Sequence, residues 1–371
     1  MRVAGPAQHT AYRSEWGLLI RPLLGMRDWR YDFKKGECIM FHEDRCTVCG
    51  DCLSWCPYIE IDEEDARKEF KKIIDGDPSR VISECVSCMG CDEICPEKAN
   101  PFSLIIKRQE AQGEFKRFEK AKQNMELAYS MPSEIRTGSE DGPVIDLCTV
   151  WPMTPHLFEG VLFEGATFLK GGRYFCGIGF YHIGMESPVE EHAAAVVEEV
   201  ARCGAREIVC FHDDCYTFFK VKAPEFGVEV PFRVVSWPEF LYRRMKELEE
   251  RIRPLDVSVA YQRPCASRYT PEKDAFVDDL FELIGARKPS RSFEGVRALC
   301  CGGSLVPRDY EMSNRIKHQN LKDAADAGAR IMVTLCPMCF LNLRKRAPEH
   351  NLLLTTISDL CRAALGEIAI G

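Results

Sequence analysis

The run Cys46-Thr-Val-Cys49-Gly-Asp-Cys52-Leu-Ser-Trp-Cys56-Pro57 recurs as Cys85-Val-Ser-Cys88-Met-Gly-Cys91-Asp-Glu-Ile-Cys95-Pro96. Each run has three cysteines at every third position and a fourth cysteine directly before a proline. Three thiolates on one tight turn can reach three irons of a cubane cluster. Structural zinc sites use paired C-x2-C elements instead, and a chain this long is not a small disulfide scaffold. The two runs therefore predict two [4Fe-4S] cubane clusters and a role in electron transfer.

This spacing resembles the cysteine run of the bacterial ferredoxins. In two-cluster ferredoxins the fourth cysteine of each run ligates the other cluster. The resemblance implies one cluster on Cys46, Cys49, Cys52 and Cys95, and a second on Cys85, Cys88, Cys91 and Cys56.

Composition narrows the class of protein. The chain has 371 residues and a net charge of −8, which argues against nucleic-acid binding because a duplex partner calls for a basic face. No run of 18 apolar residues is present, so we expect no membrane span, and the first residues do not read as a signal peptide. With 20 cysteines, this predicts a cytoplasmic protein of a reducing, anaerobic cell, with any membrane contact made through a partner.

Changes in cysteine content, charge and apolar pattern along the chain predict five segments. They are an extension (1–37), a double [4Fe-4S] ferredoxin domain (38–130), a linker (131–143) and two α/β lobes (144–253 and 254–371). The apolar cluster of the extension packs on its own domain or docks another subunit, and both possibilities stay open. Within the ferredoxin domain we expect a solvated helix over Ile61–Ile74 and one long helix over Leu104–Ala128.

Short β-rich runs alternate with helical stretches from Val144 onward, which is typical of parallel sheets built from βαβ units. Two segments repeat at one offset of 124 residues: 204–215 matches 328–339, and 173–179 matches 297–303. We therefore predict two homologous lobes with a Rossmann-like texture. No convincing nucleotide motif accompanies them, so a flavin would belong to a partner.

A second group of cysteines lies in the C-terminal lobe: Cys265, Cys300, Cys301, Cys336 and Cys339. They follow three apolar runs, and we expect three strand ends to bring them to one edge of a parallel sheet. Vicinal cysteines suit a cluster in which each meets a different iron, and the glycines after Cys301 allow close backbone approach.

This order resembles the CCG domain of the heterodisulfide reductase family. The whole arrangement is similar to the D subunit of that enzyme, or to its C and B subunits fused. The resemblance implies a noncubane [4Fe-4S] cluster on the five cysteines, where a disulfide can be split by successive one-electron steps. The implied fold is an α+β ferredoxin-like, largely helical iron–sulfur domain followed by two α/β CCG lobes.

The N-terminal lobe departs from this pattern. Gly177 stands where the second vicinal cysteine belongs, and His212 replaces the first cysteine of C-x2-C. The remaining set is Cys148, Cys176, His212 and Cys215, for which zinc, a further iron–sulfur cluster and an empty site stay open. Cys38, Cys203, Cys210 and Cys361 are interpreted as packing residues.

The predicted function is an iron–sulfur electron-transfer subunit of an anaerobic oxidoreductase complex. Electrons would enter the cubanes from a flavoprotein or iron–sulfur partner and reach the noncubane cluster. The resemblance implies as an alternative the iron–sulfur subunit of a flavin-dependent 2-hydroxyacid or glycerol-3-phosphate dehydrogenase. A disulfide reductase in its own right and a redox-sensing module are two further hypotheses. Tyr261, Gln262, Arg263 and Arg308 could contact a substrate, although we interpret them as ordinary loop residues.

Overall fold

The computed structural model describes residues 41–370. The two possibilities for the extension over residues 1–37, and the interpretation of Cys38, lie outside these residues. The helices are α1 (Asp51–Ser54), α2 (Glu63–Asp75), α3 (Arg80–Glu84), α4 (Gly90–Ile94), α5 (Pro101–Gln112), α6 (Glu119–Ala128), α7 (Ser187–Ala201), α8 (Asp213–Thr217), α9 (Ala223–Glu225), α10 (Trp237–Glu247), α11 (Asp274–Leu283), α12 (Tyr310–Asp326), α13 (Pro337–Leu343) and α14 (Ile357–Ala364). The strands are β1 (Glu134–Arg136), β2 (Val144–Cys148), β3 (Thr167–Lys170), β4 (Glu207–Cys210), β5 (Arg233–Ser236), β6 (Val257–Gln262), β7 (Ala286–Arg287), β8 (Ile331–Thr334) and β9 (Leu353–Thr356). Between residues 41 and 370, no helix is both long enough and apolar enough to cross a bilayer.

The charged insert between the two cysteine runs is helical, as predicted. Asp62 caps α2 by accepting a hydrogen bond from the Asp65 backbone N–H at 2.9 Å. One face of α2 is solvated and charged, and the other buries Ala66, Phe70 and Ile73 in the core around the cysteine runs. The helix is therefore not only a solvated surface element, because its apolar face packs in the core that surrounds the cysteine runs.

The long helix predicted over Leu104–Ala128 is broken in two. Gly113 ends α5 in the left-handed conformation, with φ +73°, and its backbone N–H bonds back to Gln109 and Glu110. Glycine adopts this conformation without the strain that a side chain would bring, so it stops a helix that propensity alone would continue. A 3₁₀ turn over Glu114–Phe118 follows, and Phe118 is buried there before α6 begins.

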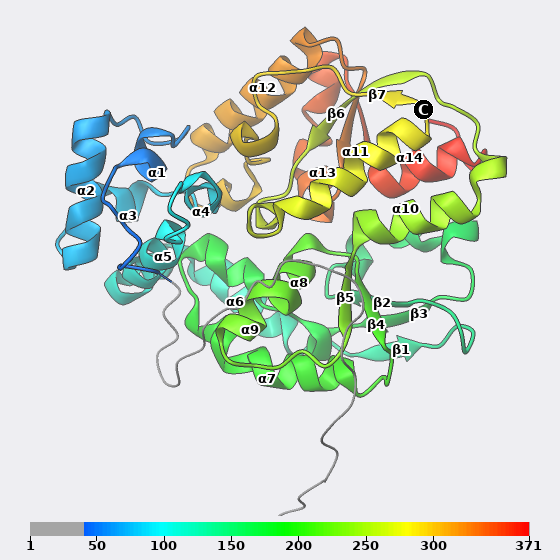
Figure 1. Ribbon diagram of the computed structural model, residues 1–371, viewed down its shortest axis with the longest axis horizontal. Coiled ribbons are helices and arrows are strands. Elements are labelled where there is room, and N and C mark those ends of the chain that lie inside the picture. Colours follow the sequence, from blue (N-terminus) through cyan, green and yellow to red (C-terminus); the bar gives the residue numbers. More distant parts are fainter. Residues whose placement is uncertain (1–40, 371) are drawn as a thin grey trace, which may run out of the picture. The chain divides into compact units, whose positions relative to one another are not determined.

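Two sheets of mainly parallel strands form the rest of the molecule (Figure 1). The strand order is β1-β3-β2-β4-β5 in the first sheet and β7-β6-β8-β9 in the second. This confirms the predicted parallel sheets. The predicted linker (131–143), however, contains β1, which pairs antiparallel with β3 and so adds an edge strand to the first sheet.

We call the first sheet with α7–α10 the first lobe, and the second sheet with α11–α14 the second lobe. β4 begins at Glu207 and β8 at Ile331, which is the offset of 124 residues found in the sequence. α10 packs against α11 and α14, and the Trp237 indole donates a 2.9 Å hydrogen bond to Ser358 Oγ. One apolar core takes residues from both sheets, such as Val209 and Val333, so the lobes are held together by shared burial.

A buried carboxyl group lies at the start of α7. Glu186 is 3% exposed and accepts a 2.9 Å hydrogen bond from Tyr181 Oη. Burial raises the pKa of Glu186 to about 7, although the charge of the fully buried Lys222 opposes the shift. The folded protein therefore binds a proton that the unfolded chain releases between about pH 4.5 and 7, and stability falls as pH rises through that window.

Glu186→Gln should consequently raise stability at pH 8, because glutamine accepts the Tyr181 hydrogen bond without burying a charge. A shift from 4.5 to about 7 corresponds to about 3 kcal/mol. We expect a higher midpoint of thermal unfolding than wild type at pH 8, and converging midpoints near pH 5. A variant less stable than wild type at pH 8 would show that the carboxylate form is the one the fold requires.

Candidate metal centres

The two cysteine runs adopt the same backbone conformation. Positive φ angles occur at Val48 and Gly50 in the first run and at the matching Ser87 and Met89 in the second. This left-handed alternation curls the chain so that successive cysteines face a common point. A Cβ on Gly50 would also lie 2.9 Å from Arg67 Cγ, so only glycine fits there without displacing that side chain.

The structure brings the eight cysteines together across the runs. One cavity is lined by Cys46, Cys49, Cys52 and Cys95. A second cavity is bordered by Cys56, Cys88, Cys91 and also Cys52, and the charges acting most on Cys56 are those of Cys88 and Cys85. Cys95 thus lies with cysteines of the first run, and Cys56 lies with cysteines of the second run.

Burial makes these sites poor places for free thiolates. It raises the pKa of Cys85 to about 11 and that of Cys56 to about 12. Iron–sulfur clusters take the deprotonated thiol, so binding the metal releases protons and supplies the positive charge that the buried sulfurs lack. The donor set therefore fits two cubane clusters.

The five cysteines of the second lobe also converge. Cys265 follows β6, Cys336 caps α13, Cys339 lies within α13, and Cys300 and Cys301 occupy a loop before a 3₁₀ turn at Gly303–Leu305. Cys265 Sγ lies 3.8 Å from Cys300 Sγ. Hydrogen bonds from Cys265 and Cys301 hold the pKa of Cys300 well below its usual value, and those from Cys339 and His212 help to do the same for Cys336. Two members of the set are therefore ready as thiolates.

One expectation about this site needs correction. Cys265 and the Cys336/Cys339 pair follow strands, but the run Val296–Leu299 before the vicinal cysteines is not a strand. Its carbonyls are taken by side chains instead: Arg268 bonds Val296 and Ala298, and Gln262 bonds Leu299. Because its backbone groups are satisfied this way, the segment does not pair with the sheet.

The turn after the vicinal cysteines depends on glycine. Gly302 has φ +76°, and a Cβ there would lie 2.9 Å from the Ser313 carbonyl oxygen. Its N–H donates to Cys300 Sγ at 3.2 Å. A glycine directly after the cysteine pair thus supplies a backbone hydrogen bond to one of the candidate ligand sulfurs.

In the first lobe, Cys148, Cys176 and Cys215 form one tight, buried group whose sulfurs all lie within 4.8 Å of one another. Cys215 Sγ and Cys176 Sγ are 3.6 Å apart. Zinc–sulfur bonds of about 2.3 Å in a tetrahedron put sulfurs about 3.8 Å apart, whereas a cubane spreads its thiolates over four irons. The spacing therefore fits a single ion such as zinc.

The structure does not place His212 with these three cysteines. Its Nε2 lies 3.2 Å from Cys336 Sγ in the second lobe, and its Nδ1 lies 3.6 Å from Asp214 Oδ2. His212 precedes α8 as Cys336 precedes α13, both with extended backbone, and the two side chains meet between the lobes. Of the four residues predicted from sequence, the three cysteines therefore lie together, and the histidine instead contacts Cys336 of the second lobe.

The other residues that the sequence singled out have mainly structural surroundings. Arg263 is buried in ion pairs, Gln262 bonds neighbouring carbonyls, and Arg308 contacts the Cys85 carbonyl and the Phe118 ring. Tyr261 Oη is buried without a hydrogen-bond partner within the described residues. Between residues 41 and 370, Cys203, Cys210 and Cys361 join none of the four cysteine groups. None of these side chains offers an evident substrate contact.

Sequence reasoning missed a residue that joins two centres. The Cys300 backbone N–H donates to Tyr58 Oη at 2.8 Å, and Tyr58 comes two residues after Cys56. A small cavity is lined by Cys88 on one side and by Cys265 and Cys300 on the other. The second ferredoxin site and the five-cysteine site therefore lie next to each other. In the sequence, Tyr58 is marked only by its place directly after Cys56-Pro57, and that place does not predict a contact with Cys300.

Comparison with known proteins agrees with this chemistry. Residues 45–100 match the family of 4Fe-4S dicluster domains, and residues 259–344 match the cysteine-rich domain called CCG. The D subunit of dihydromethanophenazine:CoB–CoM heterodisulfide reductase from Methanosarcina barkeri is 25% identical over 206 residues, covering 52% of this chain and 50% of that protein. The C subunit of ferredoxin:CoB–CoM heterodisulfide reductase from Methanosarcina acetivorans is 33% identical over 89 residues, or 23% of this chain and 36% of that protein. The chain spans about half the length of the curated D subunits that it matches.

Longer matches are more distant. An uncharacterised iron–sulfur protein of Methanocaldococcus jannaschii is 21% identical over 82% of this chain and 69% of its own length. A hypothetical protein from Helicobacter pylori has a similar fold, with a TM-score of 0.51, 13% identity, and coverage of 82% of this chain and 67% of that one. The chain thus combines a 4Fe-4S dicluster domain with a cysteine-rich CCG domain, and it is an iron–sulfur protein related to the C and D subunits of heterodisulfide reductase.

Proposed function

We propose that this protein is the electron-transfer subunit of a heterodisulfide reductase-like complex. Cys46, Cys49, Cys52 and Cys95 would hold one cubane cluster, and Cys85, Cys88, Cys91 and Cys56 the other. Cys265, Cys300, Cys301, Cys336 and Cys339 would hold a noncubane [4Fe-4S] cluster. When bound, these clusters supply one-electron carriers and a centre that can deliver two electrons in succession.

The observation that carries the proposal is the contact between the second ferredoxin site and the five-cysteine site. Tyr58 joins the chain after Cys56 directly to the Cys300 backbone, at 2.8 Å. Cys88, Cys265 and Cys300 border one small cavity. Sites this close allow electrons to pass between them without a further carrier. The residues of the chain hold the two sites next to each other.

We also propose that Cys148, Cys176 and Cys215 hold one zinc ion with a structural role. Asp146 is a candidate for the fourth ligand, because it is fully buried two residues before Cys148 and its Oδ2 has no hydrogen-bond partner among the described residues. A closed, buried zinc site of this kind stabilises the fold rather than reacting with substrate.

The donor in this proposal is a flavoprotein or iron–sulfur partner, and the acceptor is a disulfide. Reduction of a disulfide to two thiols takes up two electrons and two protons. The named relatives favour this acceptor over the dehydrogenase alternative, since they are called heterodisulfide reductases. His212 does not join the proposed zinc site, and its imidazole instead lies beside Cys336 of the five-cysteine site.

The test follows re-oxidation of the reduced protein without oxygen. Wild type, reduced by dithionite and freed from excess reductant, should lose its cubane signals when mixed with the CoB–CoM heterodisulfide. A Cys301→Ser variant should keep them at least tenfold longer. Equal re-oxidation in both proteins would overturn the relay, and no re-oxidation by disulfide, quinone or flavin would favour a redox sensor.

A further inference from the structure

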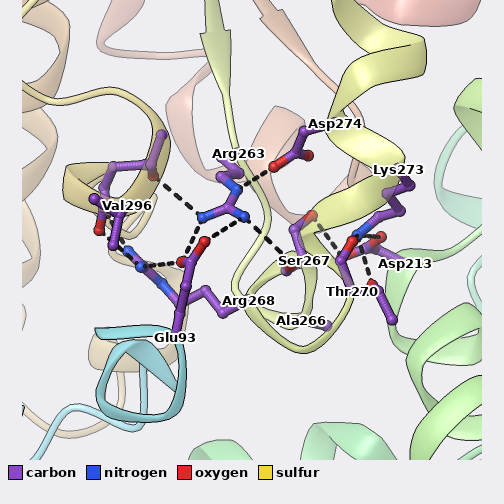
Figure 2. Close-up of polar contacts among 12 residues, drawn as sticks. Glu93, Asp213, Arg263, Ala266, Ser267, Arg268, Thr270, Lys273, Asp274 and Val296 are labelled. Atoms are coloured by element: carbon purple, nitrogen blue, oxygen red, sulfur yellow. Dashed lines mark hydrogen bonds and ion pairs between the residues drawn. The ribbon is translucent and has the colours of Figure 1, made fainter. Parts of the chain in front are cut away.

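A buried ion network joins the second cysteine run to the second lobe (Figure 2). Glu93 lies in α4 between Cys91 and Cys95, and its two carboxylate oxygens accept from the Arg263 guanidinium at 2.6 and 2.9 Å. Arg268 Nη1 adds a third contact to Glu93 Oε2, at 3.0 Å. The side chains of Glu93, Arg263 and Arg268 are only 13%, 4% and 7% exposed.

The two arginines stand on either side of Cys265. Arg263 also pairs with Asp274 at 2.6 Å, so the network holds two positive and two negative groups. Arg268 donates to the carbonyls of Val296 and Ala298, in the segment that leads to Cys300. One carboxylate of the ferredoxin region is thereby tied to two cysteine-bearing segments of the second lobe.

The same arginines line the gap between the two sites. The cavity bordered by Cys88, Cys265 and Cys300 has Arg263 and Arg268 in its wall. A Cβ on Gly90 would lie 3.5 Å from Arg268 Cζ, so the guanidinium rests against the turn that carries Cys88. The positive charge of Arg268 therefore lies between two groups of cysteines, and Glu93 balances it.

Stability alone does not account for this arrangement. Taking charges out of water is costly, and well-packed apolar residues often stabilise such a position as well or better. What a bidentate arginine–carboxylate pair adds is fixed geometry. The network is also placed where geometry and charge would act on electron transfer.

We propose that Glu93, Arg263 and Arg268 are positioning residues for electron transfer between the second ferredoxin site and the five-cysteine site. The ion network fixes the distance between the two sites, and its charge balance sets the reduction potential of one site relative to the other. One electron leaves the Cys88 side and arrives at the Cys265 side, with no bond made or broken. This inference rests on the proposed function.

Glu93→Gln in the full-length protein, purified without oxygen, tests the proposal. The amide removes one negative charge and leaves Arg268 uncompensated, which favours the reduced form of the nearest centre. We expect the potential at Cys56, Cys85, Cys88 and Cys91 to rise relative to that at Cys46, Cys49, Cys52 and Cys95. A tenfold change in the one-electron equilibrium between them is a shift of about 59 mV.

Two further readouts separate positioning from simple structural support. The magnetic interaction between the reduced centres should change in Glu93→Gln, and transfer to the five-cysteine site should slow at least tenfold. The matched control is Asp323→Asn, which breaks the buried pair of Arg291 and Asp323 in the same lobe. That pair is similarly enclosed, with side chains 2% and 13% exposed, but its hydrogen bonds go to Asn320, Tyr261, Ser292 and Phe293 rather than to a cysteine of the four groups.

The control should leave potentials and coupling at wild-type values. If Glu93→Gln behaves like Asp323→Asn with its iron retained, the proposal is overturned. If Glu93→Gln loses iron, Arg263→Lys decides instead, because it keeps the charge and removes the two-pronged contact to Glu93: altered coupling supports the network, and wild-type coupling overturns it. Potentials and coupling are measured without an acceptor, so they stay informative even if the relay to a disulfide fails.

Discussion

Replacing Cys301 by serine should lower the iron content from about twelve to about eight atoms per chain. The lost iron is that of the five-cysteine site, and the spectroscopic signals of the two cubanes should remain. Re-oxidation of the protein through that site should fall at least tenfold. Iron analysis and electron paramagnetic resonance on protein kept free of oxygen provide the measurement.

The physical reason is that the cysteines of this site come from the second lobe, whereas those of the other two sites come from the ferredoxin runs. Cys301 is 5% exposed and is fixed between the left-handed turn at Gly302 and a contact from the Asn342 amide to its own carbonyl. Serine offers a hard, neutral hydroxyl in place of a soft thiolate, and it binds iron poorly. The ferredoxin cysteines stand on α1, α4 and the turns around them, so they do not depend on Cys301.

Cys361→Ser is the matched control for this prediction. Cys361 is fully buried in α14 and belongs to none of the four groups, so the substitution brings the same buried hydroxyl, at a cost of about 1–3 kcal/mol. Its iron content should equal that of wild type. Loss of all iron from Cys301→Ser would show that the three centres assemble as one unit.

The second large effect is expected from Cys215→Ser. Wild type should contain about one zinc per chain, and the variant none. Apparent binding free energies of structural zinc in small peptides are about 10–16 kcal/mol, so the loss should cost this lobe several kcal/mol and lower the unfolding temperature strongly. Zinc analysis and calorimetry measure the two effects.

The physical reason for this effect is how closely the three sulfurs approach one another. Cys148, Cys176 and Cys215 are buried, and Cys148 Sγ also lies 3.8 Å from Thr149 Oγ1. Burial alone would raise the pKa of Cys148, but sulfur hydrogen bonds from Cys176 and Cys215 outweigh it and lower that pKa. One thiolate is thus available to begin metal binding.

Cys210→Ser provides the comparison, because Cys210 is fully buried in the same sheet but outside the group. It should keep its zinc and lose much less stability than Cys215→Ser. About sixteen irons and no zinc in wild type would instead mean that the first lobe carries a further cluster. Direct disulfide chemistry would then be the function to pursue.

Much of the local chemistry could be predicted from spacing. Cysteines of the two ferredoxin runs line shared cavities, Cys265 lies next to Cys300 in the second lobe, and β4 and β8 begin 124 residues apart as the repeat required. Predictions that relied on propensity were less successful. Gly113 divides the helix predicted over Leu104–Ala128, and β1 lies within the predicted linker.

The sequence by itself determined the spacing of the cysteines within each run, because spacing on a turn or after a strand is a local property of the chain. Only the tertiary structure decided which groups are neighbours. His212 reaches Cys336 across 124 residues, Glu93 reaches Arg263 across 170, and Tyr58 reaches Cys300 across 242. Such contacts depend on how the sheets and helices pack, and no local pattern encodes that packing. The order of the sites along the proposed electron path is therefore a property of the fold.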